Sequence, residues 1–108
     1  HITPWEACFK SAQLLGGKCE FVLSSSGHIQ SILNPPGNPK ARFFTNSEMS
    51  DDSKKWLETA TKQSDSWWQH WRDWLHARGG KRKAAPAILG NDEYPALEPA
   101  PGTYVHER

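Results

Sequence analysis

Cysteine is scarce in this chain of 108 residues, which contains only Cys8 and Cys19. The two form no C-x-x-C pair, and two cysteines do not make a disulfide framework. Reduced thiols, as in a cytosolic protein, are therefore favoured. Cys8 falls on the apolar face of an expected helix and Cys19 begins an expected strand. Since burial makes a thiol inert, both are predicted to be structural rather than nucleophilic.

Long hydrophobic runs and an excess of one charge are also missing. No apolar stretch approaches the roughly 20 residues of a membrane span, and none has the make-up of a signal peptide. Thirteen Lys and Arg face twelve Asp and Glu, so no general attraction to nucleic acid or to acidic substrates is expected. Hydrophobic residues make up 36% of the chain. The length fits one small domain with a modest core and little stability to spare.

Tryptophan, in contrast, is abundant, and four of the six cluster in "SWWQHWRDWLHARGG", residues 66–80. The pair Ser66-x-x-Gln69 predicts a capping box that starts a helix, and Gly79 and Gly80 predict its end. A buried helix anchored by tryptophan is favoured. Stacking on single-stranded nucleic acid or docking on a membrane or other hydrophobic surface are the alternatives. The predicted stripe on this helix consists of Trp67, Trp71, Trp74, Leu75 and Arg78.

The first third of the chain predicts a helix followed by a buried strand. In "HITPWEACFKSAQLLGG", Thr3 is the expected N-cap, Pro4 the first helical residue, and Glu6 completes a capping box. The short apolar segment "CEFVL", residues 19–23, is typical of a buried strand. A helix, a short loop and a buried strand make half of a βαβ unit, which favours the α/β class. The predicted apolar face of the helix comprises Trp5, Cys8, Phe9, Ala12 and Leu15.

The remaining segments are shorter or irregular. "IQSIL" (29–33) predicts one helical turn that "NPPGNP" must break, and "KARFFTN" (40–46) predicts an extended segment. A second helix is expected from Ser53 through "KKWLETATK". Residues 81–108 are rich in Pro and Gly without periodicity. Because this tail still carries six large apolar residues, it is expected to be irregular chain packed on the body. The six apolar residues are Ile88, Leu89, Tyr94, Leu97, Tyr104 and Val105.

His28 follows the expected strand by five residues, counted from Leu23. Loops beyond the carboxyl ends of strands hold the active-site groups of α/β proteins, and a general base needs a fixed ring near a nucleophile. Position and residue type alone favour a plainer hypothesis, a loop histidine that bonds a backbone carbonyl. The serines at 24–26 lack the glycines of a nucleophile elbow and are expected to cap loop backbone. No metal site is expected, because His70 and His76 are six apart, not three or four.

Four blocks read together resemble the carboxyl-terminal end of polyhydroxyalkanoate synthases, of the class II, medium-chain-length type. They are "HITPWEAC", "FVLSSSGHIQSILNPPGNPKARFFTN", "DSWWQHWRDWL" and "YPALEPAPGTYVHER". The resemblance implies that residues 1–108 are the last portion of an α/β-hydrolase-type catalytic domain. That domain would polymerise (R)-3-hydroxyacyl-CoA into polyester, with release of CoA. The family uses a Cys-Asp-His triad, and His28 matches its histidine. The aspartate and the nucleophilic cysteine of the family would precede His1, so Cys8 and Cys19 inherit no role.

The resemblance also implies the partners and the surroundings. The CoA thioester is a substrate, so no cofactor and no metal are expected. The expected partners are the acyl-CoA, the growing polyester chain, the remainder of the catalytic domain and further copies of the enzyme. No nucleic acid is expected. The enzyme would work in the cytoplasm, at the surface of polyester granules, and this segment alone would be inactive and marginally stable.

Two rival functions remain at this point. The first is a lipase- or depolymerase-like hydrolase of the same fold class, in which water accepts the acyl group. A serine in the upstream nucleophile box would favour hydrolysis, and a cysteine would favour thioester transfer. The second is a binding module, whose tryptophan helix and tail dock on a granule, a nucleic acid or a protein.

Overall fold

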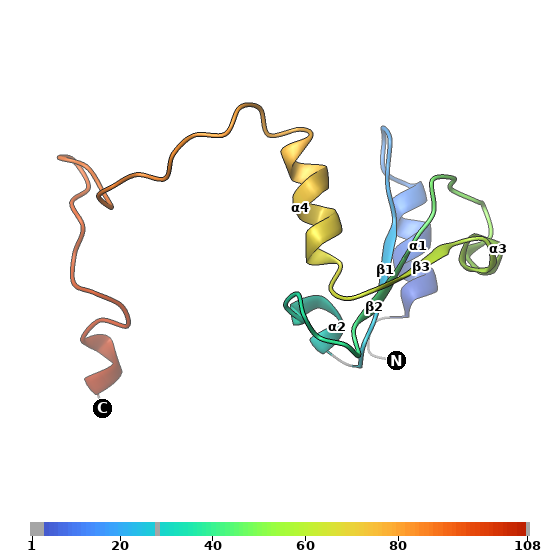
Figure 1. The fold of residues 1–108 in the computed structure, drawn as a ribbon, viewed down its shortest axis with the longest axis horizontal. Helices are drawn as coiled ribbons and strands as arrows, with labels where there is room; N and C mark the ends of the chain where they lie inside the picture. The colour runs from blue at the N-terminus through green and yellow to red at the C-terminus, as the bar shows by residue number, and fades with distance from the viewer. Residues whose placement is uncertain (1–3, 28, 108) are drawn as a thin grey trace.

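A computed structural model describes residues 4–27 and 29–107, which form a small body followed by a long tail (Figure 1). Short helices and strands alternate through the body, and one 3-10 turn lies near the end of the tail. In chain order they are α1 (Trp5–Gln13), β1 (Val22–Ser25), α2 (Gln30–Leu33), β2 (Arg42–Thr45), α3 (Ser53–Glu58), β3 (Thr61–Ser64), α4 (Trp68–His76) and η1 (Tyr104–His106).

The three strands form one antiparallel sheet in the order β1-β2-β3. Leu23 pairs with Phe44, and Phe44 pairs with Lys62. The chain therefore mixes helices and sheet, compatible with the α/β class, but the expected half of a parallel βαβ unit is wrong for these strands. The strand also begins at Val22 rather than residue 19 and is only partly buried. Its polar end, Ser24 and Ser25, explains this, because antiparallel sheets tolerate one solvated face and parallel sheets are covered on both.

An aromatic cluster forms the core on one side of the sheet. Phe9 of α1 and Trp56 of α3 are both fully buried, and their ring centroids lie 5.6 Å apart. Phe21, just before β1, packs edge-on against both, at 5.1 Å from Phe9 and 5.2 Å from Trp56. Trp5 completes the cluster. Such edge-to-face pairs add about 0.5–1.5 kcal/mol each beyond the area they bury, so this cluster joins α1 and α3 to the sheet.

The predicted apolar face of α1 is confirmed only in part. Phe9 is buried and Trp5 is half-buried, but Cys8 is exposed, so its expected burial is wrong. Leu15 is exposed as well, because the helix ends at Gln13 and the periodicity no longer applies beyond it. The predicted N-cap Thr3 lies outside the described residues.

The second predicted helix begins at Ser53 as expected but ends at Glu58, and the next residues form β3. The Asn46 side-chain amide donates to the carbonyl of Trp56 and to Thr59 Oγ1, at 3.1 and 2.8 Å. These bonds hold the last turn of α3, after which Thr61 and its neighbours pair with β2. Threonine has low helix and high strand propensity, and the neighbouring strand decides the outcome.

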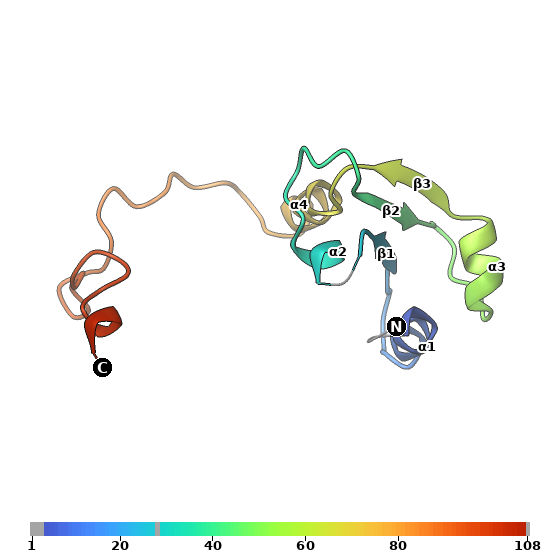
Figure 2. The same ribbon diagram turned by 90° about the horizontal axis from the view of Figure 1, so that it is seen from below.

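Helix α4 lies across the sheet from α1 and α3 and is not buried (Figure 2). It contacts the sheet through the ring of His70, whose centroid is 5.9 Å from that of Phe43. None of its residues is buried, and Trp71 is 49% exposed. The expectation of a buried tryptophan helix is therefore wrong for this chain, because no described element covers the outer side of α4. The capping box forms only in part: Ser66 Oγ accepts from the Trp68 amide, while Gln69 turns to Asp65.

The tail beyond α4 is irregular, as predicted, but it leaves the body instead of packing on it (Figure 1). The radius of gyration is 19.1 Å, against about 13 Å for a compact domain of this length. All six large apolar residues of the tail are exposed, Leu97 at 88%. Their irregular spacing gives the tail no continuous apolar face with which to cover the sheet.

Truncating the centre of the aromatic cluster tests this description of the core. Phe9→Ala is expected to lower the free energy of unfolding by about 3–5 kcal/mol, because it leaves a cavity between α1, α3 and Phe21. Phe9→Leu should cost clearly less, since it keeps most of the buried volume. Urea denaturation followed by tryptophan fluorescence measures both. Leu97→Ala is the control, expected within about 0.5 kcal/mol of the parent; an equal effect of Phe9→Ala and Leu97→Ala would contradict this core.

Candidate functional site

The candidate site is the loop between β1 and α2. Strand β1 ends at Ser25 and α2 begins at Gln30. His28, the predicted catalytic residue, lies between them in sequence and outside the described residues. Gly27, its neighbour, has φ of +67°, a left-handed conformation that glycine adopts at no steric cost. The flanking chain therefore leaves the strand through a tight turn and enters α2 almost at once.

Side-chain hydrogen bonds tie the two ends of this loop together. Ser24 Oγ, in β1, donates to the backbone carbonyl of Ser31, in α2. Ser26 Oγ accepts from the Asn34 side-chain amide at 2.8 Å. Ser24 thus bonds a backbone carbonyl as expected, although that carbonyl belongs to α2 and not to the loop, and Ser26 bonds a side chain instead. That none of these serines is a nucleophile stays a prediction. Two bridges across so short a segment hold both flanks of residue 28 against one another.

A second set of bonds fixes α2 to the start of α4. Ser66 Oγ donates to the backbone carbonyl of Asn34 at 2.6 Å, and both residues are buried. The indole Nε1 atoms of Trp67 and Trp68 both donate to the carbonyl of Ile32, at 3.1 and 2.8 Å. The last carbonyls of a helix have no partner within it. Here the residues at the start of α4 donate to these carbonyls, so the tryptophans attach α4 to α2 through their indole N–H groups.

The bonds of Asn34 and Ile32 to residues 66–68 form a joint between α2 and the start of α4. Asp65 adds hydrogen bonds to this joint, and the sequence did not predict this role. One carboxylate oxygen accepts from the backbone amides of Gly37 and Ser66, both at 2.7 Å. Asp65 also has φ of +85°, the only positive value of a non-glycine residue among those described. Asp and Asn are the side chains that tolerate this conformation best. The signal in the sequence was weak: an aspartate before a capping serine, with a Pro-Pro-Gly turn far away along the chain.

An open groove lies beside the other end of β1, with a volume of about 280 Å³. His70 and Glu20 line the groove, and His70 Nε2 lies 2.7 Å from Glu20 Oε1. This bond ties α4 to the residues that lead into β1. The walls are otherwise mainly tryptophan, so the groove is an apolar surface with one polar pair. Its lining is Glu20, Val22, Trp67, His70, Trp71 and Trp74.

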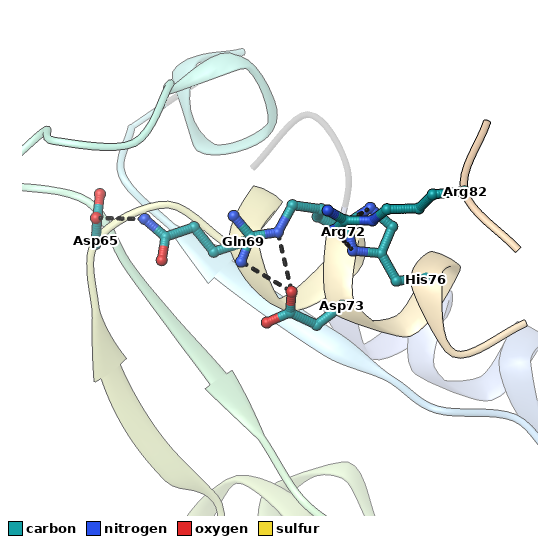
Figure 3. A network of polar contacts seen from close by, with 6 residues as sticks. All are labelled: Asp65, Gln69, Arg72, Asp73, His76 and Arg82. Atoms are coloured by element: carbon teal, nitrogen blue, oxygen red, sulfur yellow. Dashed lines mark hydrogen bonds and ion pairs between the residues drawn. The ribbon is translucent and has the colours of Figure 1, made fainter. Parts of the chain in front are cut away.

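The polar side of α4 is occupied by its own pairs (Figure 3). Gln69 donates to Asp65, the Arg72 guanidinium bonds the Asp73 carboxylate at 2.8 Å, and Arg82 lies 3.0 Å from His76 Nδ1. Exposed pairs of this kind contribute little to stability, typically below about 1 kcal/mol. They nevertheless engage Arg72, Asp73 and His76 of α4.

Metal ligands, membrane spans and reactive thiols are the other features by which residues 4–27 and 29–107 could form a site. No group of three His, Cys, Asp or Glu side chains in these ranges is placed to hold a metal ion. No helix there is long and apolar enough to cross a membrane. Both cysteines are free, with Cys8 exposed and Cys19 half-buried.

Comparison with curated proteins gives strong matches along the chain. It is 63% identical over all 108 residues to poly(3-hydroxyalkanoate) polymerase 1 of Ectopseudomonas oleovorans. It is 56% identical to polymerase 2 of the same organism. Over 105 residues it is 45% identical to a polymerase subunit from Cupriavidus necator. The chain belongs to the poly(3-hydroxyalkanoate) polymerase family. No family model matches it.

The match is complete for this chain but partial for its relatives. All 108 residues align with the Ectopseudomonas polymerases, yet they span 19% of the length of each. The polymerase resemblance drawn from the "SGHI…NPP" and tryptophan blocks is thus confirmed. The β1–α2 loop and its attachment to α4 are built from those same two blocks. The joint described above is therefore a feature of a polymerase segment.

Substitutions at Asp65 test the joint between α2 and α4. Asp65→Ala is expected to lower the free energy of unfolding by about 2–3 kcal/mol, because two backbone amides lose their acceptor and alanine is strained at positive φ. Asp65→Asn keeps an acceptor oxygen and tolerates the same φ, so it should cost less than about 1 kcal/mol.

Chemical denaturation of a polymerase that contains this chain measures these differences. Asp73→Ala is the matched control, since it removes a carboxylate from an exposed pair within α4, the helix that follows Asp65. Equal losses for Asp65→Ala and Asp73→Ala would show that Asp65 does not hold the joint.

Proposed function

We propose that this chain is the carboxyl-terminal part of the catalytic domain of a polyester synthase. The complete enzyme polymerises (R)-3-hydroxyacyl-CoA into polyhydroxyalkanoate and releases CoA. The observation that carries this proposal is the 63% identity to a poly(3-hydroxyalkanoate) polymerase over the whole chain. The similarity to the Ectopseudomonas polymerases further supports the class II, medium-chain-length type and an α/β-hydrolase-type fold for the complete domain.

In this proposal His28 is the general base of the enzyme. It takes the proton from a cysteine thiol outside this chain, and the thiolate attacks the thioester carbonyl of the incoming acyl-CoA. The C–S bond to CoA breaks, and the imidazolium returns its proton to the leaving thiolate. His28 then deprotonates the 3-hydroxyl that attacks the enzyme-bound acyl group. The bond from the acyl carbon to the cysteine sulfur breaks, and the imidazolium returns its proton to the cysteine thiolate. An aspartate, also outside this chain, orients the imidazole and stabilises its cationic form.

The chain around residue 28 supports such a role. A base must hold its ring within hydrogen-bond reach of the thiol, about 2.6–3.2 Å. The described flanks of the loop are held by Ser24, Ser26 and Asn34, and through Ser66 by α4. A loop attached at this many points loses little further freedom when substrate binds. That is the property required of a segment that carries a base.

The same proposal assigns the partners. The acyl-CoA and the growing polyester are substrates, so the reaction needs no cofactor from this chain. The apolar surface of α4 faces the remainder of the catalytic domain or further copies of the enzyme, at the surface of cytoplasmic polyester granules. Large exposed apolar surfaces are typical of such contacts.

Replacing the base tests the proposal. In the full-length polymerase, His28→Ala is expected to lower the rate of CoA release on the order of 10³-fold, because the thiol and the hydroxyl lose their proton acceptor. The assay follows free CoA with a thiol reagent, and the melting temperature is measured in parallel. His76→Ala, an exposed histidine of α4, is the control and should keep the parent rate. A folded His28→Ala enzyme with the parent rate would contradict the proposal.

A further inference from the structure

Asn34 is one of two buried polar residues in the described part of the chain, with Ser66 as the other; their exposed fractions are 8% and 3%. Leaving a buried polar group without a partner costs about 1–3 kcal/mol. An asparagine at this position therefore needs a reason beyond filling space. Its hydrogen bonds give one, because each joins a different part of the site.

All the polar groups of Asn34 are engaged. Its Nδ2 donates to Ser26 Oγ at 2.8 Å, and its Oδ1 accepts from the Asn38 side chain at 2.9 Å. Its backbone amide donates to Gln30 at the start of α2, and its carbonyl accepts from Ser66. One residue thus connects the end of β1, helix α2, the Pro-Pro-Gly turn and the start of α4. A fully satisfied buried network of this kind rigidifies its surroundings.

The connection to Ser26 matters most for chemistry. Ser26 stands two residues before His28 in sequence, and Asn34 stands six residues after it. The Asn34 amide is thus a bridge across the segment that contains the base. Without the bridge, the strand side of the loop loses one of its attachments to the α2 side, while the bond from Ser24 to Ser31 remains. The chain near residue 28 would then sample more conformations, and fewer would be productive.

We propose that Asn34, acting through Ser26 and anchored by Ser66, is the positioning residue for the base His28. This inference rests on the proposed function. Because Asn34 is buried, its loss should act on the catalytic step and not on acyl-CoA binding. A misplaced catalytic group can cost about 100-fold in rate even when the change is distant from the chemistry.

The test uses the full-length polymerase with Asn34→Ala and Ser26→Ala. Asn34→Ala is expected to lower kcat about 10- to 100-fold and to leave KM within about threefold, since uniform binding is unaffected. Ser26→Ala, a one-atom change, should lower kcat in the same direction. Because both residues act through one bond, the double variant should be no slower than Asn34→Ala alone, as a double-mutant cycle detects.

Asn46→Ala is the matched control. Asn46 also uses its side-chain amide to join two segments, bonding Trp56 and Thr59 at the far end of the sheet. It should lower the melting temperature without changing kcat at a temperature where the enzyme is folded. Asn34→Asp keeps the shape and the acceptor oxygen, and Ser26 can turn its hydroxyl to donate, so it should recover part of the lost kcat.

The outcomes separate this inference from the proposed function. If His28→Ala abolishes activity while folded Asn34→Ala keeps the parent kcat, as Asn46→Ala does, the positioning role is overturned and the base stands. If His28→Ala keeps its activity, the proposed function fails first. If Asn34→Ala does not fold, Ser26→Ala decides: a parent kcat for that variant overturns the inference, and a reduced kcat with unchanged KM supports it.

Discussion

The buried hydrogen bond from Ser66 Oγ to the Asn34 carbonyl is the interaction on which the arrangement of this segment depends. On one side of it lie β1, the loop that contains residue 28, and α2. On the other side lies α4 with its tryptophans. The aromatic cluster around Phe9 and Trp56 stabilises α1, α3 and the sheet, but it does not reach α4. The polar joint made by Asn34, Ser66 and Asp65 therefore helps to set how the sheet and the tryptophan helix meet, together with the contacts that His70 makes with Glu20 and Phe43.

This joint uses polar groups where apolar packing would be the usual choice. The aromatic cluster places the fully buried Phe9 and Trp56 on one side of the sheet, while the large apolar residues of the tail lie exposed and cover neither side. A network of short hydrogen bonds between small side chains is directional, so it fixes one geometry where apolar contacts would allow several. A segment proposed to carry a base needs a defined geometry, because the base must lie within hydrogen-bond reach of its proton donor.

The local features of this segment were predictable from sequence because their causes are local. Pro35 and Pro36 must end a helical turn, and Ser53 begins α3 as expected. The features that the sequence did not predict depend on contacts between residues far apart in the chain. Strand β3 looked like the continuation of a helix, and pairing with β2 made Thr61 and its neighbours a strand. The hydrogen bonds from Gly37 to Asp65 and from Ser66 to Asn34 join residues about 30 positions apart, and no periodicity in the sequence predicts them.

The tryptophans of residues 67–74 both bond α2 and present an exposed apolar surface. Trp67 and Trp68 use their indole N–H groups to hold α2, while the apolar parts of the neighbouring Trp71 and Trp74 remain uncovered. The chain spans 19% of the length of its polymerase relatives, and in the proposed synthase the remainder of the catalytic domain is the expected cover of this surface. The tryptophan helix and the strand side of the loop are attached to the same short helix, α2. Trp67 and Trp68 bond its Ile32 carbonyl, and Ser24 bonds its Ser31 carbonyl.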